Sequence, residues 1–174
     1  MKLRAFCSSD AVKILEWISS EREFRMWSAD RFGDYPISPD DMAAHYSECS
    51  SNGMFFPFTA VDDYNNVLGH LILRYTNEEK NEVRFGFVIV DSSARNRGVG
   101  RSMLELAKTY AVDVLRAETI SLGVFENNLP ARKCYAAAGF CESEDSDEVY
   151  NVLGEKWRCV EMKLSSCSTE YKLK

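Results

Sequence analysis

Three strand-like segments follow one another in the middle of the chain, with only short polar connections between them. They are Met54–Val61, Val67–Tyr75 and Glu82–Val90, and each is rich in aromatic and β-branched residues. The connections Asp62–Asn66 and Thr76–Asn81 are too short for the crossover helix that joins two parallel strands. The sequence therefore predicts an antiparallel meander, which argues against a fold built from parallel strands linked by helices.

The chain before these segments predicts a short strand and two helices. The strand is Lys2–Phe6, Ser9 or Asp10 can cap the first helix, and Ser38 can cap the second. The stretch Ser19–Pro39 mixes aromatic and charged residues without a sustained period. We expect irregular structure or short helical turns there.

The chain after the meander returns to a helical period. A helix of about five turns follows Arg97, then a strand at Thr119–Phe125, a short helix at Leu129–Ala138, and two strands near Phe140 and across Trp157–Leu164. The apolar stripe that we expect on the long helix is Val99, Met103, Leu106, Ala107, Tyr110, Val114 and Leu115.

Charge and composition exclude several classes of protein. Lys and Arg total 21 against 27 Asp and Glu, and this net charge of −6 disfavours a general affinity for nucleic acid. No apolar run is long enough for a membrane span, and the first ten residues lack the apolar core of a signal peptide, so we expect a cytoplasmic protein without a membrane partner. The six cysteines form no C-x-x-C pair, and we expect no metal site.

The segment Asp91–Ser102 joins an apolar strand directly to the long helix. It contains the spacing R-x-x-G-x-G, and Arg95, Arg97 and Arg101 place three positive charges around the helix start. The first amide N–H groups of a helix lack intrahelical partners, and glycines let an anion approach them closely. This acidic chain therefore has one local site suited to a pyrophosphate.

Other phosphate-binding loops fit this segment poorly. A Walker A loop needs Lys where Arg101 follows Gly100, and a dinucleotide fingerprint needs a small residue where Met103 stands. An ordinary strand-turn-helix with solvated arginines fits the segment equally well when it is taken alone.

A second segment, Asn127–Phe140, predicts a short capped helix. Asn128 can cap it, Tyr135 follows two turns later, and Gly139 can end it. Taken alone, Tyr135 is most simply a core aromatic.

Together, the two segments resemble the GNAT superfamily of N-acetyltransferases. The resemblance implies acetyl-CoA as cosubstrate, with its pyrophosphate on the loop before the long helix and its pantetheine arm along the preceding strand, near a bulge. The residues that it assigns to the cofactor are Ile89, Val90, Asp91, Arg95, Arg97, Gly98, Val99, Gly100, Arg101, Ser102, Asn128 and Tyr135.

Resemblance and element order together predict the fold class. We expect an α/β chain of the α+β type, with a twisted, mixed, mostly antiparallel sheet of about six or seven strands flanked by about four helices. We expect one domain over residues 1–165 and a polar tail at 166–174.

The implied reaction is attack by a neutral amine on a thioester. Tyr135 matches the tyrosine that often acts as general acid in this family, and its phenol is protonated at neutral pH. The positions aligned with the family's glutamate bases hold Arg84 and Gly123. Glu82 shares a strand face with Arg84 and is either a base acting through water or a solvated carboxylate. Another candidate base is Glu23 or Asp34, and an amine of low pKa needs none.

Two segments match the acceptor-binding regions of the family. The first holds Glu23, Trp27 and Tyr35, and the second is an acidic run. Aromatic and carboxylate groups suit a cationic amine, although a solvated acidic loop and core aromatics explain the same residues. The acidic run comprises Glu142, Glu144, Asp145, Asp147 and Glu148.

The function implied is transfer of an acetyl group to a primary amine, with a small-molecule acceptor favoured. The alternatives are transfer of another acyl group, acylation of a protein N-terminus or lysine, and a regulatory module that binds CoA without catalysis. We expect a monomer or a homodimer.

Overall fold

The computed structural model describes residues 1–143 and 148–164, and these form a mixed sheet flanked by helices. This confirms the predicted fold class, although the described residues hold eight strands and five α-helices, more than expected. The strands are β1 (Lys2–Ala5), β2 (Phe55–Val61), β3 (Val67–Tyr75), β4 (Glu82–Val90), β5 (Thr119–Phe125), β6 (Phe140–Glu142), β7 (Glu148–Val152) and β8 (Glu155–Leu164). The helices are α1 (Asp10–Glu16), α2 (Glu21–Ser28), α3 (Pro39–Ser50), α4 (Val99–Asp113) and α5 (Leu129–Ala137), with a 3₁₀ turn at Ser92–Ala94.

The sheet order is β1-β2-β3-β4-β5-β8-β6, and β7 also pairs with β8. The strands β2, β3 and β4 form the predicted antiparallel meander. Only β4 and β5 pair in parallel within the described residues, because α4 lies between them in the chain and crosses one face of the sheet.

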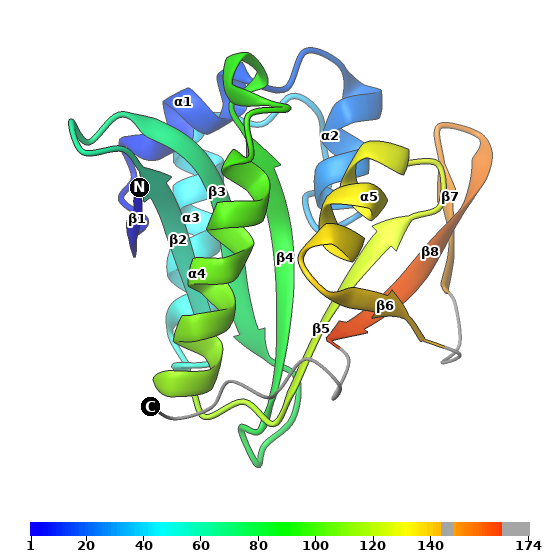
Figure 1. The fold of residues 1–174 in the computed structure, drawn as a ribbon. Coiled ribbons are helices and arrows are strands. Elements are labelled where there is room, and N and C mark those ends of the chain that lie inside the picture. The colour runs from blue at the N-terminus through cyan, green and yellow to red at the C-terminus, as the bar shows by residue number, and fades with distance from the viewer. Residues whose placement is uncertain (144–147, 165–174) are drawn as a thin grey trace.

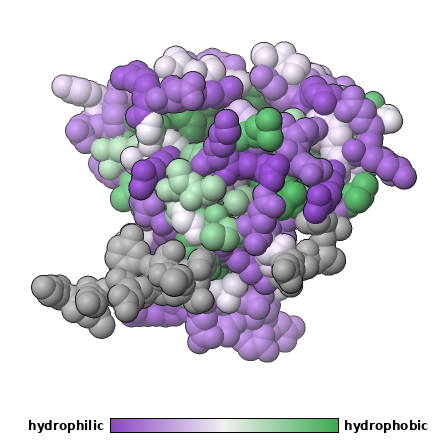
Figure 2. All heavy atoms as spheres, turned by 45° about the vertical axis from the view of Figure 1, so that its right-hand side comes forward, coloured by the Kyte–Doolittle hydropathy of each residue, from purple (hydrophilic) through white to green (hydrophobic). Residues whose placement is uncertain are grey.

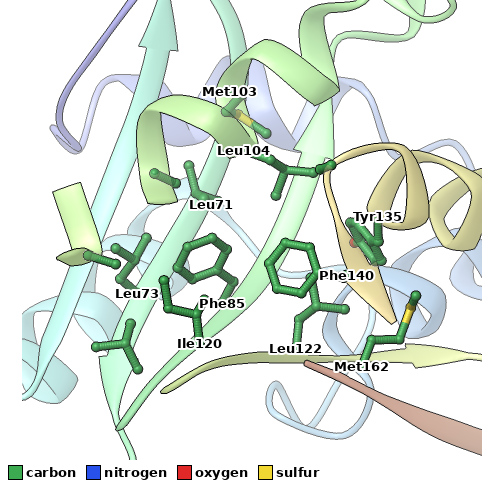
Figure 3. Packing of buried hydrophobic residues seen from close by; sticks show 14 of the residues in the cluster. Leu71, Leu73, Phe85, Met103, Leu104, Ile120, Leu122, Tyr135, Phe140 and Met162 are labelled. Carbon is green, nitrogen blue, oxygen red and sulfur yellow. The ribbon is translucent and has the colours of Figure 1, made fainter. Parts of the chain in front are cut away.

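Helices cover both faces of the sheet. Helices α4 and α5 lie on one face, and α1, α2 and α3 lie on the other (Figure 1). Under α4 and α5 the buried side chains of Phe85, Leu104, Leu122, Tyr135 and Phe140 belong to one core cluster (Figure 3). A second cluster on the opposite face includes Ile14, Phe24, Met42, Tyr46 and Ile72.

Helix α2 lies where the sequence predicted irregular structure or short turns. The Ser20 side chain caps it by accepting a hydrogen bond from the Glu23 N–H. Only Phe24 and Ser28 are buried among its eight residues. Met26 and Trp27 are partly buried against the core clusters, but charged residues stand among these apolar side chains. A helix of eight residues is therefore too short for its apolar spacing to stand out in the sequence.

The predicted apolar stripe of α4 was partly wrong. Met103, Ala107 and Ala111 are buried, whereas Leu106 is 36% exposed and Val114, just past the helix end, is 57% exposed. The buried stripe includes small alanines because α4 packs closely on the sheet. The larger Leu106 and Val114 lie at the side of this stripe and face solvent, although their spacing in the sequence is helical.

Strand β7 is the strand that the sequence prediction missed. It pairs with the first half of β8 across a turn at Leu153 and Gly154, both of which have positive φ. Val152 is buried, but Glu148, Val149 and Asn151 are exposed, so the strand shows no clear alternation. The tail predicted at 166–174 lies outside the described residues.

Hydrophilic residues predominate on the face shown in Figure 2, and hydrophobic residues lie in smaller patches among them. Within residues 1–143 and 148–164, no helix is both long and apolar enough to cross a membrane. The same residues contain no group of three or more His, Cys, Asp or Glu side chains that could hold a metal ion.

Candidate functional site

Strands β4 and β5 run side by side at one end and separate at the other. Their last paired residues are Phe85 and Leu122, and beyond this pair the ribbons diverge (Figure 1). Strand β5 remains paired with β8 as far as Phe125. Among the described strands, none pairs with the β4 backbone after Phe85 on the side toward β5.

A bulge in β4 lies just past this point of separation. Gly86 is opposite Ile72 and Ile89 is opposite His70, so Phe87 and Val88 together face the single residue between them on β3. Phe87 has a positive φ of 49°, as expected where an extra residue is inserted.

The bulge changes which face of the sheet each β4 side chain meets. Before it, Val83 and Phe85 belong to the core under α4. After it, Phe87 and Ile89 pack into the cluster on the α1–α3 face. The bulge thus inserts one residue into β4, so that odd-numbered side chains after it face the opposite side of the sheet from those before it.

The sequence predicted backbone contacts to the cosubstrate at Ile89, Val90 and Asp91. Of these three residues, Val90 is the one whose backbone N–H and carbonyl face the opening between β4 and β5. The Asp91 N–H donates to the Leu68 carbonyl (2.9 Å), so the Val90 N–H and carbonyl point away from β3. The Val90 carbonyl accepts a hydrogen bond from Arg95 Nε (3.4 Å). Ile89 pairs with β3, and the Asp91 carboxylate accepts from the Ser93 N–H and hydroxyl.

The start of α4 is an open amide site. Its N-cap is Gly98, in the left-handed conformation with φ 81°, and no side chain caps the helix. Ser102 is the first residue whose N–H bonds back to the Gly98 carbonyl (3.0 Å). Consequently the N–H groups of Val99, Gly100 and Arg101 have no intrahelical acceptor, and no acidic residue lies in this turn.

Positive charge surrounds these amides. Arg95, Arg97 and Arg101 are exposed, and none forms an ion pair with another residue in the described part of the chain. The helix dipole adds partial positive charge at the same place. The residues present therefore fit a bound pyrophosphate.

Helix α5 packs against this start and carries Tyr135. A Cβ on Gly100 would lie 3.1 Å from Cys134 Sγ, which shows how closely the two helices approach. The Asn128 side-chain oxygen caps α5 by accepting from the Ala131 N–H (3.2 Å).

Tyr135 is 7% exposed and its ring packs near Phe140 (Figure 3). Burial raises the pKa of its phenol well above the ordinary value. The fully buried side-chain polar atoms without a partner in the described residues are Trp27 Nε1 and His70 Nδ1. The Tyr135 hydroxyl is not one of them, and no described residue hydrogen bonds to it, so it keeps contact with solvent.

The structure separates Glu82 from the loop that precedes α4. Glu82 is the first residue of β4, is exposed, and accepts a hydrogen bond from the Thr76 hydroxyl (3.1 Å). Val90 is the last residue of the same strand, and a strand of this length spans about 25 Å. Glu82 and the open amides of α4 therefore lie at opposite ends of β4.

The other predicted carboxylates are also engaged or remote. Hydrogen bonds from the Ser19 hydroxyl and N–H lower the pKa of Glu23, so its carboxylate is a weaker base than an ordinary glutamate. Asp34 is exposed and lies between α2 and α3.

The predicted acceptor aromatics pack against other aromatic rings. Trp27 stacks on Phe32 at 5.9 Å between ring centres and lies 5.3 Å from Phe87, while Tyr35 packs on Phe24 at 5.3 Å. Within the acidic run, Glu142 pairs with Arg132, and a Glu148 oxygen accepts from the Tyr150 hydroxyl. Glu144, Asp145 and Asp147 lie outside the described residues.

Arg84 and Gly123, the two positions that depart from the family pattern, are in contact. Arg84 Nη1 donates to Glu161 Oε1 on β8 (2.6 Å), and Glu161 is the register partner of Gly123. The alternation of side chains along β4 is enough to predict which face of the sheet Arg84 lies on. Glu161 was missed, because nothing local links a residue near the end of the chain to β4.

Comparison with known proteins agrees with this architecture. A sequence model of the acetyltransferase (GNAT) family matches residues 14–140. The spermidine N-acetyltransferase of Vibrio cholerae, solved in complex with CoA and spermine, has a TM-score of 0.77 at 21% identity, covering 93% of each chain. A chimeric form of that enzyme gives a TM-score of 0.76 at 20% identity, covering 94% of this chain and 95% of the other.

Proposed function

The chain belongs to the acetyltransferase (GNAT) family, and from this premise we propose that it transfers the acetyl group of acetyl-CoA to a primary amine by direct attack on the thioester. The members of this family are acyltransferases that use acetyl-CoA. The observation that supports the proposal best is the open, arginine-rich start of α4 beside the point where β4 and β5 separate.

We assign the pyrophosphate of the cosubstrate to the start of α4. The N–H groups of Val99, Gly100 and Arg101 would donate to phosphate oxygens, and Gly98 leaves the approach to them clear. Arg95, Arg97, Arg101 and the Ser102 hydroxyl would add charge and hydrogen bonds from the same loop.

We assign the pantetheine arm to the free edge of β4. The Val90 N–H and carbonyl point away from β3 and toward the diverging β5, so they can pair with an amide of the arm. The Asn128 side chain uses its oxygen as a helix cap, which leaves its Nδ2 group as a donor. When bound, the cosubstrate supplies an acyl group activated as a thioester.

The chemistry needs donors for the developing oxyanion and a proton for the departing thiolate. Backbone N–H groups at the β4 bulge can serve as the donors, since the edge from Gly86 onward has no strand partner toward β5. Tyr135 can supply the proton because its phenol is protonated at neutral pH, and burial, which raises its pKa, makes it a weaker acid than a free tyrosine. The amine nitrogen gains a bond to the acyl carbon, the carbon–sulfur bond breaks, and Tyr135 protonates the sulfur. Solvent then returns a proton to the Tyr135 phenolate.

The proton released by the amine is assigned to solvent. Glu82 lies at the far end of β4, and the hydrogen bonds from Ser19 lower the pKa of Glu23 and so make it a weaker base. Arg84 occupies the position aligned with a family glutamate and cannot act as a base. We therefore propose that the enzyme takes up the neutral form of its amine.

The acceptor is proposed only as a primary amine. The neighbouring spermidine N-acetyltransferase, solved with spermine, supports an amine acceptor for a chain of this fold. A regulatory module that binds CoA without catalysis is the second candidate, because both aligned glutamate positions are replaced, by Arg84 and Gly123.

Two measurements test the proposal. Acetyl-CoA should raise the melting temperature of the protein by mass action, and a panel of primary amines should then release free CoA thiol. Failure of acetyl-CoA to stabilise the protein would remove the assignment of the α4 start. Stabilisation without thiol release from any amine would favour the regulatory module.

A further inference from the structure

A polar cleft of about 470 Å³ lies on the sheet face opposite α4. Its floor is formed by side chains of β3, β4, β5 and β8, which alternate with residues that point into the core under α4. Its basic residues are Arg31, Arg74, Arg84 and Lys163, and its acidic residues are Glu82, Glu148 and Glu161.

The acidic side chains of the cleft already have partners. Glu161 pairs with Arg84 (2.6 Å), Glu82 accepts from the Thr76 hydroxyl (3.1 Å), and Glu148 accepts from the Tyr150 hydroxyl. Each of these contacts uses part of the hydrogen-bonding capacity that a cationic ligand would need.

Arg74 is in the opposite situation. Its side chain is half-buried, and no described residue forms an ion pair or hydrogen bond with it. Burial together with the neighbouring charges of Arg84 and Arg31 lowers its pKa from the usual value. Arg31 itself has only a long contact with Asp30, at 3.9 Å, among the described residues. A partly desolvated guanidinium beside two others favours an anion in the space between them.

The cleft adjoins the proposed reaction centre. Arg84 and Ser121 form the register pair next to the last one, Phe85 and Leu122, beyond which β4 and β5 separate. An Nη atom of Arg84 lies 2.6 Å from the position of a Cβ on Gly123, so the guanidinium reaches over β5 at the separation. An acceptor that enters between the strands from this face would pass Arg84.

We propose that this cleft binds a carboxylate or phosphate group of the acceptor, with Arg74 as its main partner and Arg31 beside it. The acceptor is then an amine that carries an anionic group at a distance from its nitrogen. This inference rests on the proposed acetyltransferase function and specifies its substrate class. An acceptor with an anionic group differs from the cationic amine that the acidic run suggested in the sequence.

The test compares acceptors that differ only at the end remote from the amine. An ω-amino carboxylate, the aminoalkyl phosphate, the amino alcohol and the diamine of equal chain length are each offered with acetyl-CoA over several lengths, with spermidine added. We expect kcat/KM for thiol release to be at least about ten-fold higher for an anionic acceptor than for the matching diamine, as a charge-assisted hydrogen bond provides. The carboxylate and phosphate arms identify which anion is preferred.

Variants locate the effect. Arg74→Gln should lower kcat/KM for the anionic acceptor by about ten-fold to a hundred-fold through KM, and leave the diamine nearly unchanged. Arg31→Gln should also lower kcat/KM for the anionic acceptor. Because Arg31 is exposed, this variant tests the proposal even where Arg74→Gln impairs folding. Lys2→Gln removes an exposed positive charge from the far edge of the sheet and should change neither acceptor.

The outcomes separate the two proposals. Spermidine or the diamines as the better acceptors would overturn the anionic cleft while supporting the acetyltransferase. An anionic preference that survives both arginine variants would also overturn it. Thiol release from no acceptor, with acetyl-CoA still stabilising the protein, would count against the acetyltransferase itself and the inference built on it.

Discussion

The guanidinium of Arg84 lies directly over Gly123, with one Nη atom 2.6 Å from the position that a Cβ on residue 123 would take. Cys159 Sγ lies 2.9 Å from the same position. These contacts join the two departures from the family pattern into one arrangement. The arginine on β4 needs a residue without a side chain on β5, and Glu161 on β8 holds the arginine there.

The first prediction is that the two positions are energetically coupled. Gly123→Ala should lower the free energy of unfolding by about 1–2 kcal/mol, because the methyl group must displace Arg84 from Glu161. In an Arg84→Ala background the same change should cost less, giving a coupling of at least about 0.5 kcal/mol. Denaturant unfolding of the four proteins measures this, and strictly additive costs would contradict the coupling.

The second prediction concerns acid. His70 is fully buried, its Nε2 lies 2.8 Å from the Tyr46 hydroxyl, and burial lowers its pKa to about 3. The unfolded chain takes up this proton near pH 6.5, whereas the folded chain resists it. Stability should therefore fall as pH drops from about 6 toward 3, by about 1.4 kcal/mol for each pH unit from this group.

Asp10 adds to the loss at the acid end of this range. Burial favours its neutral form, but hydrogen bonds from Arg4, the Cys7 N–H and the Thr59 hydroxyl outweigh burial and lower its pKa. Its contribution is present above its unfolded pKa and is lost as pH falls below about 4. Melting temperatures across pH 7 to 2 test the sum of the two contributions. His70→Gln should flatten the upper part of the curve, and an unchanged slope in this variant would exclude His70 as the cause.

The parts of the fold that were predicted correctly depend on local patterns. The boundaries of β3 and β4 follow from runs rich in aromatic and β-branched residues between short polar connections, and α3 begins at Pro39 after Ser38, which forms a capping box with Asp41. The arginines and glycines before α4 also form a local signal, because a helix start collects its ligand groups from adjacent residues.

The parts that were missed depend on contacts between distant segments. Helix α2 and strand β7 are both short, and distant segments of the chain bury their inner sides. The arginine cleft draws Arg74 from β3, Arg84 from β4 and Glu161 from β8, so no local pattern could assemble it. The resemblance implied a bulge in this strand, but its position at Phe87 and Val88 depends on the pairing with β3.

The third prediction separates the cofactor role of Gly98 from its backbone conformation. Gly98 has φ 81°, and no described atom lies within 4 Å of the position that a Cβ would take, so Gly98→Ala meets only backbone strain of about 1 kcal/mol in the free protein. The methyl group would nevertheless be added at the N-cap, next to the open amides of α4 in the chain. We expect the dissociation constant for acetyl-CoA to rise about ten-fold or more, measured by calorimetry, as the loss of a charge-assisted hydrogen bond would give.

Gly53→Ala is the matched control for this change. Gly53 has φ 67° and equally open surroundings, but it lies after α3, away from the start of α4. It should lose a similar free energy of unfolding while keeping its affinity for acetyl-CoA. Equal losses of affinity in both variants would point to general destabilisation and would contradict a cofactor site at Gly98.

The last prediction tests Tyr135 as the acid. Tyr135→Phe removes a hydroxyl that no described residue hydrogen bonds, so the packing against Phe140 and the affinity for acetyl-CoA should be nearly unchanged. The rate of thiol release should fall by about 10²-fold to 10⁴-fold, the range for loss of a general acid.

The pH dependence of the parent enzyme gives a second test of Tyr135. Because burial raises the pKa of the phenol, Tyr135 stays protonated, and its titration should not lower the rate up to about pH 9. Single-turnover thiol release across pH measures both effects, and Tyr110→Phe on α4 is the control for loss of a phenol elsewhere. An unaltered rate in Tyr135→Phe would leave protonation of the thiolate to solvent.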